Sequence, residues 1–233
     1  MRVAVYTLTR DRLPYTRKSL KALRVMAGLD FDYYVGDNGS GADTREYLVE
    51  QAEKGRIHTL QLHDENIGQN LAANALLDEM GPGYDWIVRW DNDMIPRTRR
   101  FLAKLLRVGE RCKEYGVIPV LTPTITKLKF PPPALRMVDM EELELEQIGI
   151  AGGMCRAHTG KMFEDFRYNK FAPLGFGEAN EMANFCEQTG VPILRVPGLE
   201  VEHLYGEDKQ IEENPDEFTW ERRDVGRYVG YGL

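Results

Sequence analysis

Two aspartates, Asp91 and Asp93, stand two residues apart directly after the apolar stretch WIVRW at residues 86–90. Carboxylate oxygens are the ligands that hard divalent cations such as Mg²⁺ and Mn²⁺ prefer. A cation held there could bridge a diphosphate and neutralise the charge that develops on it as it leaves. Asn and Asp at a strand end also form turns that cap the next helix. The segment therefore predicts a divalent-metal site, with a structural turn as the alternative.

Polar residues at two earlier strand ends are candidates for ligand binding. The segment DNGS at 37–40 closes a second apolar stretch, and Asp37 could accept hydrogen bonds from a base or a ribose, with Asn38 beside it. Asn66, Gly68 and Asn74 follow a third stretch, and Gly68 lets the backbone approach a ligand closely because it has no Cβ. The structural alternatives are a plain turn at 37–40 and an ordinary helix start at Gly68.

The second half of the chain offers two further candidates. Gly152 and Gly153 are adjacent glycines that would permit close passage of a sugar, or else form a bulge at a strand end. His203 follows Glu202 at the end of the last predicted strand. A lone histidine is more often structural, but at a strand end it could ligate a metal.

The elements that must position these residues follow from apolar runs alternating with longer amphipathic stretches. In the first half the order strand, helix, strand, helix indicates a parallel sheet with crossover helices. Ligands bind beyond the carboxyl ends of such strands, so we expect the polar strand ends to share one edge. We predict strands over residues 2–8, 31–36, 57–62 and 86–90, and helices over 13–27, 44–54 and 68–80.

The second half is less regular. Three consecutive prolines followed by an acidic run predict an insertion or excursion loop over residues 127–146. Neither an internal repeat nor a separating linker is visible, so a single domain is expected. The predicted strands are 117–124, 148–155, 193–197 and 199–203, and the predicted helices are a basic one at 97–115 and one at 178–189.

Composition and missing motifs exclude several classes of protein. The 233 residues are 42% hydrophobic and 29% charged, as in ordinary globular proteins. A formal net charge of −7 argues against binding of nucleic acid through the overall charge of the protein. The first strand is followed by TLTRDRLP rather than GxGxxG, which excludes a standard dinucleotide fingerprint there. GxxxxGK[ST], HExxH and GxSxG are also missing, and no apolar run reaches the ~18 residues of a membrane span.

The cysteines and the amino-terminal residues indicate the cellular compartment of the protein. Cys112, Cys155 and Cys186 are odd in number, widely spaced and form no CxxC pair, so they suggest no disulfide framework. A reducing compartment is therefore expected. The segment MRVAVYTLTRDR is too short and too polar for a secretory signal, and we expect a cytoplasmic protein without a transmembrane segment.

Taken together, these motifs resemble a family 2-type glycosyltransferase of the GT-A fold, over roughly residues 1–205. That resemblance implies an α/β fold with a mostly parallel central sheet flanked by helices. It divides the single domain, 1–233, into a nucleotide-sugar-binding half at 1–95, an acceptor half at 96–205 with an insertion at 127–147, and an extension at 206–233. The matching segments are YTLTR at 6–10, DNGS at 37–40, NIG at 66–68 with Asn74, DND at 91–93, GG at 152–153 with Arg156, GE at 177–178 and VEH at 201–203.

The resemblance also implies a donor, a metal and residue roles. The donor would be a nucleotide-sugar, most often a UDP-sugar. The metal, Mn²⁺ or Mg²⁺, would be held by Asp91, Asp93 and His203. The residues assigned to the nucleotide-sugar are Thr7, Thr9, Arg10, Asp37, Asn38, Asn66, Gly68, Asn74, Asp91, Asn92, Gly152 and Gly153.

The sequence departs from the family pattern at the general base. The family's helix usually reads Gly-Glu-Asp, and its Asp deprotonates the acceptor hydroxyl in inverting members. Here the segment is GEANE at 177–181, so Ala179 stands at the base position. Glu178 could serve instead, as could Glu181, which shares its helix face. Retaining chemistry would need no such base. We expect an inverting enzyme with Glu178 favoured over Glu181.

The acceptor and the function class stay open at this point. A saccharide or small-molecule hydroxyl is the expected acceptor, and a modified, hydroxymethylated DNA base is a less favoured one. A nucleotidyltransferase of similar fold and a non-catalytic nucleotide-sugar-binding module are the alternatives, and Ala179 favours the latter. The DNA acceptor depends on a run of basic residues beside the metal motif: Arg97, Arg99, Arg100, Lys104, Arg107, Arg111 and Lys113.

Overall fold

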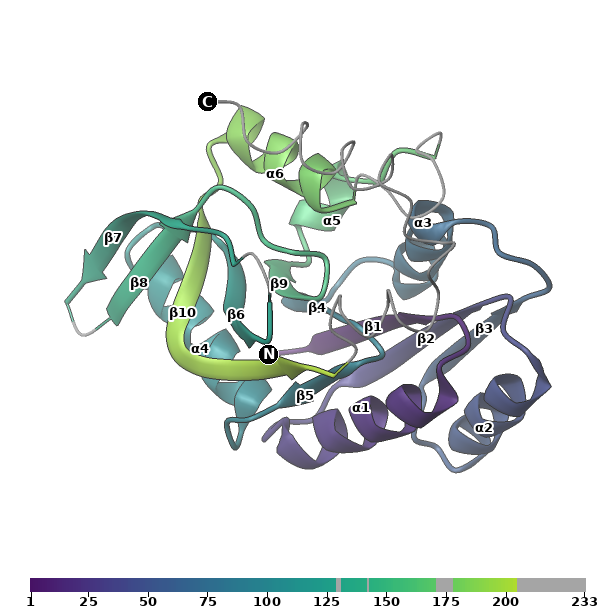
Figure 1. The fold of residues 1–233 in the computed structure, drawn as a ribbon. Coiled ribbons are helices and arrows are strands. Elements are labelled where there is room, and N and C mark those ends of the chain that lie inside the picture. Colours follow the sequence, from purple (N-terminus) through teal and green to yellow (C-terminus); the bar gives the residue numbers. More distant parts are fainter. Residues whose placement is uncertain (129–130, 142, 171–177, 205–233) are drawn as a thin grey trace.

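A computed structural model describes residues 1–128, 131–141, 143–170 and 178–204. Within them, a ten-stranded sheet carries helices on both faces (Figure 1). Helices α1, α2 and α4 cover one face, and α3, α5 and α6 cover the other. The predicted extension at 206–233 and Gly177 of the predicted GE segment lie outside the described residues.

The first half of the chain confirms the predicted alternation of strands and helices. Its four strands lie in the order β3-β2-β1-β4 and all pair in parallel. The carboxyl ends of β1, β2 and β4 therefore meet at one edge of the sheet. The elements are β1 (Val3–Thr9), α1 (Leu13–Met26), β2 (Asp32–Asn38), α2 (Ala42–Glu53), β3 (Thr59–His63), α3 (Gln69–Met80) and β4 (Trp86–Trp90).

The second half extends the same sheet in the order β4-β9-β6-β10-β8-β7, with β5 paired to β10. Strands β6 and β10 run parallel, whereas β9 is antiparallel to both β4 and β6. The elements are β5 (Met94–Pro96), α4 (Phe101–Glu114), β6 (Val120–Thr126), β7 (Ala134–Met140), β8 (Leu143–Ile148), β9 (Cys155–Thr159), α5 (Met162–Asp165), α6 (Glu178–Thr189) and β10 (Ile193–His203).

Two sequence predictions in this half are wrong. The loop predicted at 127–146 contains most of an antiparallel hairpin, β7–β8. Its acidic run, LELEQI, alternates apolar and polar side chains, and Leu145 reaches the core. The strand predicted at 148–155 lies instead at β9, whose residues are all buried although three of them are polar. Burial of Arg156 and His158 hid this strand from a hydrophobicity pattern.

Two further elements also differ from the prediction. Helix α4 begins at Phe101 rather than at residue 97, because the Arg97 amide donates to the Glu200 carbonyl of β10 and Arg100 adopts a left-handed φ of 57°. The strands predicted at 193–197 and 199–203 are one strand, β10, with a register shift between Val196 and Glu200 where it pairs with β6.

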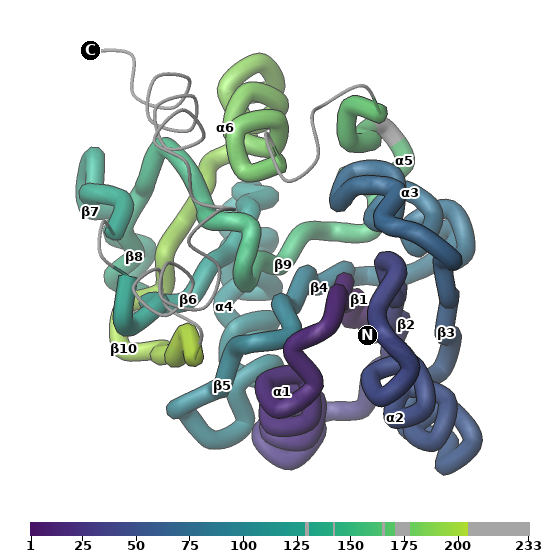
Figure 2. The backbone as a smooth tube through the Cα atoms, turned by 45° about the vertical axis from the view of Figure 1, so that its right-hand side comes forward, coloured from purple at the N-terminus to yellow at the C-terminus, as the bar shows by residue number. Residues whose placement is uncertain are grey.

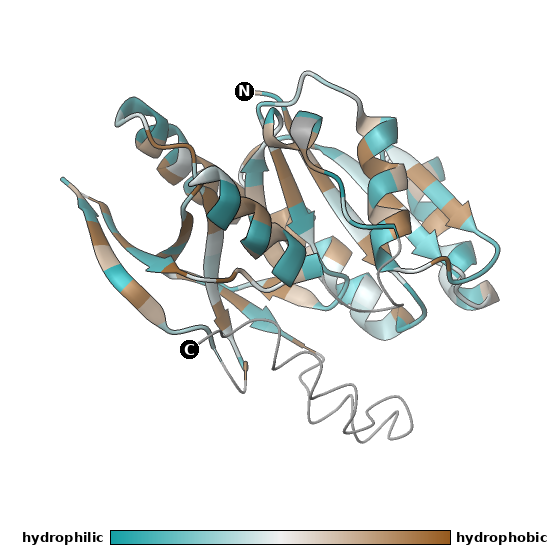
Figure 3. Cartoon of the chain, turned by 90° about the horizontal axis from the view of Figure 1, so that it is seen from above, coloured by the Kyte–Doolittle hydropathy of each residue, from teal (hydrophilic) through white to brown (hydrophobic). Residues whose placement is uncertain are grey.

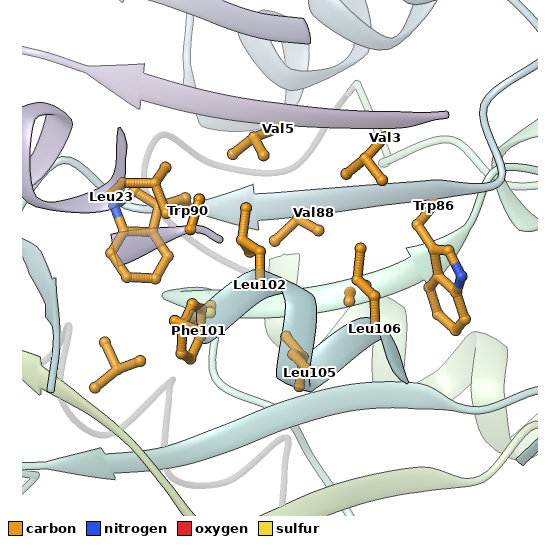
Figure 4. Close-up of a cluster of buried hydrophobic side chains, with 14 of the residues drawn as sticks. Val3, Val5, Leu23, Trp86, Val88, Trp90, Phe101, Leu102, Leu105 and Leu106 are labelled. Carbon is orange, nitrogen blue, oxygen red and sulfur yellow. The ribbon is translucent and has the colours of Figure 1, made fainter. Parts of the chain in front are cut away.

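The larger core cluster packs α1 and α4 against the sheet (Figure 4). Trp90 meets Phe101 of α4 edge-on, with ring centroids 5.5 Å apart. A Cβ on Gly109 would lie 2.4 Å from the Trp86 ring, so α4 approaches the sheet closely there. Figure 3 shows long hydrophobic stretches along the strands, whereas the helices carry both hydrophobic and hydrophilic residues. This packing fixes β4, which delivers the two aspartates.

Candidate functional site

The predicted metal motif and the predicted late histidine lie side by side. His203 Nε2 is 3.3 Å from Asp93 Oδ2, and both side chains are buried. The pairing of β10 with β5 brings them together, because His203 lies opposite Met94 and the Leu204 amide donates to the Asp93 carbonyl. Arg12 Nη1 lies 3.6 Å from the same carboxylate oxygen.

Asp91, the first aspartate of the motif, is held by the neighbouring arginine of its own strand. Arg89 Nε donates to Asp91 Oδ1 at 3.0 Å. Burial raises the pKa of Asp91, with a further rise from the negative charge of Asp93, while Arg89 and His203 act in the opposite direction. The two carboxylates are therefore close enough to repel each other, and a cation between them would relieve that repulsion.

The donor atoms at Asp93 and His203 fit a divalent metal that is shared with a ligand. Within the described residues, no group of three His, Cys, Asp or Glu side chains could hold an ion by itself. Asp93 and His203 offer one oxygen and one nitrogen at a common point. Mg²⁺ favours oxygen ligands, whereas a carboxylate with an imidazole suits Mn²⁺ better. Oxygens of a bound ligand and water would have to complete the coordination.

Three of the predicted nucleotide-binding residues fix the loop from inside. Asn92 Nδ2 donates to Thr9 Oγ1 at 3.0 Å and to Thr16 Oγ1 at 2.9 Å. Thr7 Oγ1 donates to the Trp90 carbonyl at 2.6 Å. All of these side chains are buried, so they tie β1 and α1 to the aspartate loop. Arg10, in contrast, is exposed just after β1.

Asp37 at the end of β2 carries a buried hydrogen-bond acceptor that no described residue satisfies. Its side chain is 0% exposed. Oδ2 accepts from the Ser40 amide at 3.1 Å and lies 3.9 Å from Arg45 Nε. Oδ1 has no hydrogen-bond partner among the described residues. Buried acceptors are normally satisfied, so this oxygen is suited to an N–H or O–H group of a ligand.

Asn38 and Asn66 shape the loop between β3 and α3. Asn38 Nδ2 donates to Asn66 Oδ1 at 2.7 Å, and Asn38 Oδ1 accepts from the Ile67 amide at 3.0 Å. The Gly68 amide donates to Asn66 Oδ1 at 3.1 Å. Gly39, in the same turn, has φ +79°, and a Cβ there would lie 2.6 Å from the carbonyl carbon of Glu65. These residues hold the loop against the end of β2.

Helix α3 anchors the segment that follows α5, and the two helices lie side by side in Figures 1 and 2. Asn74 forms two hydrogen bonds with the backbone of Tyr168, at 2.8 and 2.9 Å. Glu181 is part of this anchor. Its Oε1 accepts from Asn70 Nδ2 at 3.0 Å, and its Oε2 accepts from the Asn169 amide at 2.6 Å. Both oxygens of Glu181 are therefore occupied.

Glu178 lies between two buried arginines. Arg89 of β4 and Arg156 of β9 face each other across the two strands. Both guanidinium groups contact Glu178 Oε1, that of Arg156 at 2.5 Å. Glu178 Oε2 has no hydrogen-bond partner among the described residues. The Cβ position of Gly153 lies 3.6 Å from that oxygen, next to Gly152 in the chain.

Sequence reasoning missed Arg89, although the strand WIVRW contains the signal. A charged residue in an otherwise apolar, fully buried strand requires a buried partner. The network runs from Asp91 through Arg89 and Glu178 to Arg156, whose Nη2 also donates to the Tyr168 hydroxyl at 2.6 Å. It connects the aspartate motif to the first residue of α6.

Among the described residues, three of the seven basic side chains beside the motif have carboxylate partners. Arg97 pairs with Glu202, Arg111 with Glu114 and Glu141, and Lys113 with Glu110. The other four, Arg99, Arg100, Lys104 and Arg107, form no ion pair with a described residue, so the run keeps part of its positive charge. Among the described helices, none has the length and apolar character that a membrane crossing needs.

Solved structures provide the comparison, since no protein-family model matches the chain and a search of curated proteins gives no match. GalNAc-T7 with UDP, GalNAc and Mn²⁺ has a TM-score of 0.70 at 14% identity, over 89% of this chain and 44% of its own. Pyrobaculum calidifontis mannosyltransferase PcManGT, with GDP-Man and Mn²⁺, has 0.63 at 15% identity, over 88% and 57%. An S. aureus TarS structure has 0.60 at 14% identity, over 96% and 68%.

These likenesses show the fold. The chain has the GT-A fold, with a central, mostly parallel sheet flanked by helices, as the sequence predicted. Its structural neighbours are nucleotide-sugar glycosyltransferases, two of them solved with Mn²⁺. The chain spans about half the length of the first two, 44% and 57%. No family model supports assignment of the chain to glycosyltransferase family 2.

Proposed function

We propose that this chain is a metal-dependent glycosyltransferase that moves a sugar from a nucleotide-sugar, in the first place a UDP-sugar, to an acceptor hydroxyl. The observation that carries the proposal is the Asp93–His203 pair, 3.3 Å apart, at the edge of the sheet where Asp37 Oδ1 has no partner among the described residues. The neighbours support it because their structures hold UDP or GDP-Man together with Mn²⁺.

In this proposal Asp37 recognises the donor's base or ribose. Its Oδ1 is a buried acceptor without a partner among the described residues. The N3–H group of uracil is a donor of the required kind, whereas cytosine has an acceptor at that position. A hydrogen bond to an ionised carboxylate contributes about 1.5–3 kcal/mol. Asp37→Asn should therefore weaken donor binding by at least about tenfold.

Asp93 and His203 would hold the metal, which supplies a positive charge to the departing diphosphate. Asp91, fixed by Arg89, would carry a second carboxylate toward the same charge. The chain's own part is to place these groups at the end of β4 and β10 before the donor arrives. The mixed donor set favours Mn²⁺ over Mg²⁺.

Glu178 is the proposed general base. Its Oε1 is anchored by the two arginines, while Oε2 is without a partner among the described residues and lies beneath Gly153. The proton of the acceptor hydroxyl would pass to Oε2 as the hydroxyl oxygen bonds to the anomeric carbon. The bond from that carbon to the diphosphate oxygen breaks, and the configuration inverts. Glu181 is less suited, because both of its oxygens already accept hydrogen bonds.

The test is Asp93→Ala in a transfer assay with Mn²⁺ and a panel of nucleotide-sugars and saccharide acceptors. We expect metal-dependent turnover to be lost, and the matched control Asp78→Ala to keep it, because Asp78 is an exposed residue paired with Arg167. Unchanged turnover in Asp93→Ala would refute the metal site. Glu178→Gln should lower kcat at least about 10²-fold if Glu178 is the base.

A non-catalytic nucleotide-sugar-binding module is the second candidate. Ala179 at the expected base position and the clamped state of Glu178 both favour it. A thermal-shift panel of nucleoside diphosphates with and without Mn²⁺ separates the candidates when combined with the transfer assay. Binding with turnover supports the enzyme, and binding without turnover of any donor supports the module.

A further inference from the structure

A second concave site lies between α1 and α2, away from the aspartate edge. Figures 1 and 2 show these two helices side by side. The cleft between them has a volume of about 500 Å³, within the range of small-molecule pockets. Its floor is apolar and aromatic, formed mainly by Leu20, Tyr33 and Ile57, which are buried.

The rim of the cleft is strongly basic. Five cationic side chains and one carboxylate, that of Glu50, are among the described residues that line the cleft. The whole chain, in contrast, has a net charge of −7. In the described part of the chain, only one of the five cations, Lys54, has a carboxylate within 4.0 Å. The cations are Arg17, Lys21, Arg24, Lys54 and Arg56, and all are exposed.

Tyr47 lines the same cleft as the five cations. The guanidinium carbon of Arg17 lies 5.0 Å from the centre of its ring. Burial raises the pKa of Tyr47, while the positive charges of Arg17, Arg24 and Arg56 act against that rise. Arg17 therefore lies over the ring, and Arg24 and Arg56 line the same cleft. Positive charge of this density is normally relieved by counter-charges, and here the protein supplies few of them.

The local backbone positions the two cations that follow α2, Lys54 and Arg56. Lys54 follows the helix, and Gly55 adopts φ +65°, which turns the chain sharply back. The Arg56 amide then donates to the Gln51 carbonyl at 2.9 Å, and Arg56 Nη1 donates to Gln51 Oε1 at 3.0 Å. Lys54 and Arg56 thus flank one tight turn at the edge of the cleft.

The cleft is distinct from the candidate glycosyltransferase site. On α1, Thr16 and Ser19 bond to the aspartate loop from the buried face of the helix, whereas the α1 cations that line the cleft are exposed. Tyr33 stands near the start of β2, whereas Asp37 stands near the other end of that strand. A ligand in the cleft would therefore not occupy the site of Asp37, Asp93 and His203.

We propose that the α1–α2 cleft binds a small molecule that carries two or more phosphate groups beside an apolar or aromatic part. The phosphates would pair with Lys21, Arg24 and their neighbours on the rim. The aromatic part would lie against Tyr47. The volume admits a small ligand but not a nucleic-acid duplex, and the inference does not depend on the proposed transferase function.

The experiment is isothermal titration of the whole chain with pyrophosphate and with ADP, in EDTA and without any sugar donor. ADP adds an aromatic base to the same diphosphate. The test variant is Lys21→Glu/Arg24→Glu. The matched control is Lys104→Glu/Arg107→Glu, which changes the net charge equally on exposed positions of α4. Thermal unfolding of each variant, and a milder Lys21→Gln/Arg24→Gln variant, guard against misfolding.

The wild type should bind both probes, and ADP more tightly. The test variant should weaken both Kd values at least about tenfold, with the control within about twofold. Tyr47→Ala should weaken ADP but leave pyrophosphate unchanged. Absence of binding to the wild type, or equal weakening in test and control variants, would overturn the proposal. Sedimentation with vesicles that contain a polyphosphoinositide, lost in the test variant alone, would assign the phosphates to a lipid rather than to a free ester.

Discussion

Replacing Glu178 by glutamine tests the buried network most directly. The substitution keeps the shape and removes the charge. Arg89 and Arg156 face each other on adjacent strands, and in the described residues Glu178 is the carboxylate that both of them contact. Both arginines are at most 1% exposed, so water cannot solvate their charges when the charge of Glu178 is removed. The variant leaves two like charges side by side in the interior, and among the described carboxylates Asp91 is the one left beside Arg89.

The expected loss of stability is large. Removing one partner of a buried ion pair destabilises a protein by about 3–5 kcal/mol, mainly because the remaining charge stays buried without a partner. For a chain of this size each kcal/mol lowers Tm by about 2–4 °C. Glu178→Gln should therefore lower Tm by about 6–20 °C.

The assay is thermal unfolding followed by circular dichroism. Glu114→Gln is the matched control, because Glu114 is 60% exposed and pairs with Arg111 at the surface; its Tm should not change measurably. The double variant Arg156→Met/Glu178→Gln should lose less than the sum of its single variants, with a coupling of at least about 1 kcal/mol. A Tm for Glu178→Gln within about 2 °C of wild type would refute the network and the placement of Glu178 in it.

Three further predictions concern other parts of the fold. Gly39→Ala should destabilise the chain by about 2–3 kcal/mol in urea unfolding, and Gly55→Ala, also at positive φ but with open space around it, by about 1 kcal/mol. Burial lowers the pKa of His158 well below 6.5, so below pH 6.5 the imidazole takes up a proton only in the unfolded chain. The free energy of unfolding should therefore fall by up to about 1.4 kcal/mol for each pH unit below 6.5. This fall should be less steep in His158→Leu. The three thiols, all buried and free, should react with a thiol reagent only after denaturation; rapid native labelling would contradict their burial.

The first half of the fold could be predicted because its signals are local. Each parallel strand is a short apolar run, and each ends in polar residues such as Asp37 or Asp91. The parallel register then brings those ends to one edge without further information. The partnership of Asp93 with His203 followed only from the family resemblance, since pairing of β5 with β10 is a contact between distant segments.

The second half resisted prediction because its strands break the usual rules. Strand β9 buries Arg156 and His158, and β8 consists largely of leucines alternating with glutamates. From its hydrophobicity pattern alone, β9 is interpreted as a polar segment and β8 as part of a loop. The roles of Asn74 and Glu181 were equally hidden, because they bond to the backbone of Tyr168 and Asn169 and, for Glu181, also to the distant Asn70 side chain, which no sequence spacing reveals.

The same network constrains how any catalytic role of Glu178 can be demonstrated. Arg89 contacts both Asp91 and Glu178, so the aspartate motif and the first residue of α6 belong to one electrostatic unit. A loss of activity in Glu178→Gln could therefore arise from displaced aspartates as well as from a missing base. Donor binding separates the two causes: a missing base lowers kcat and leaves donor affinity intact, whereas displaced aspartates weaken donor binding too. Measured below the variant's Tm, that comparison assigns Glu178 Oε2 either to proton transfer or to support of the metal motif.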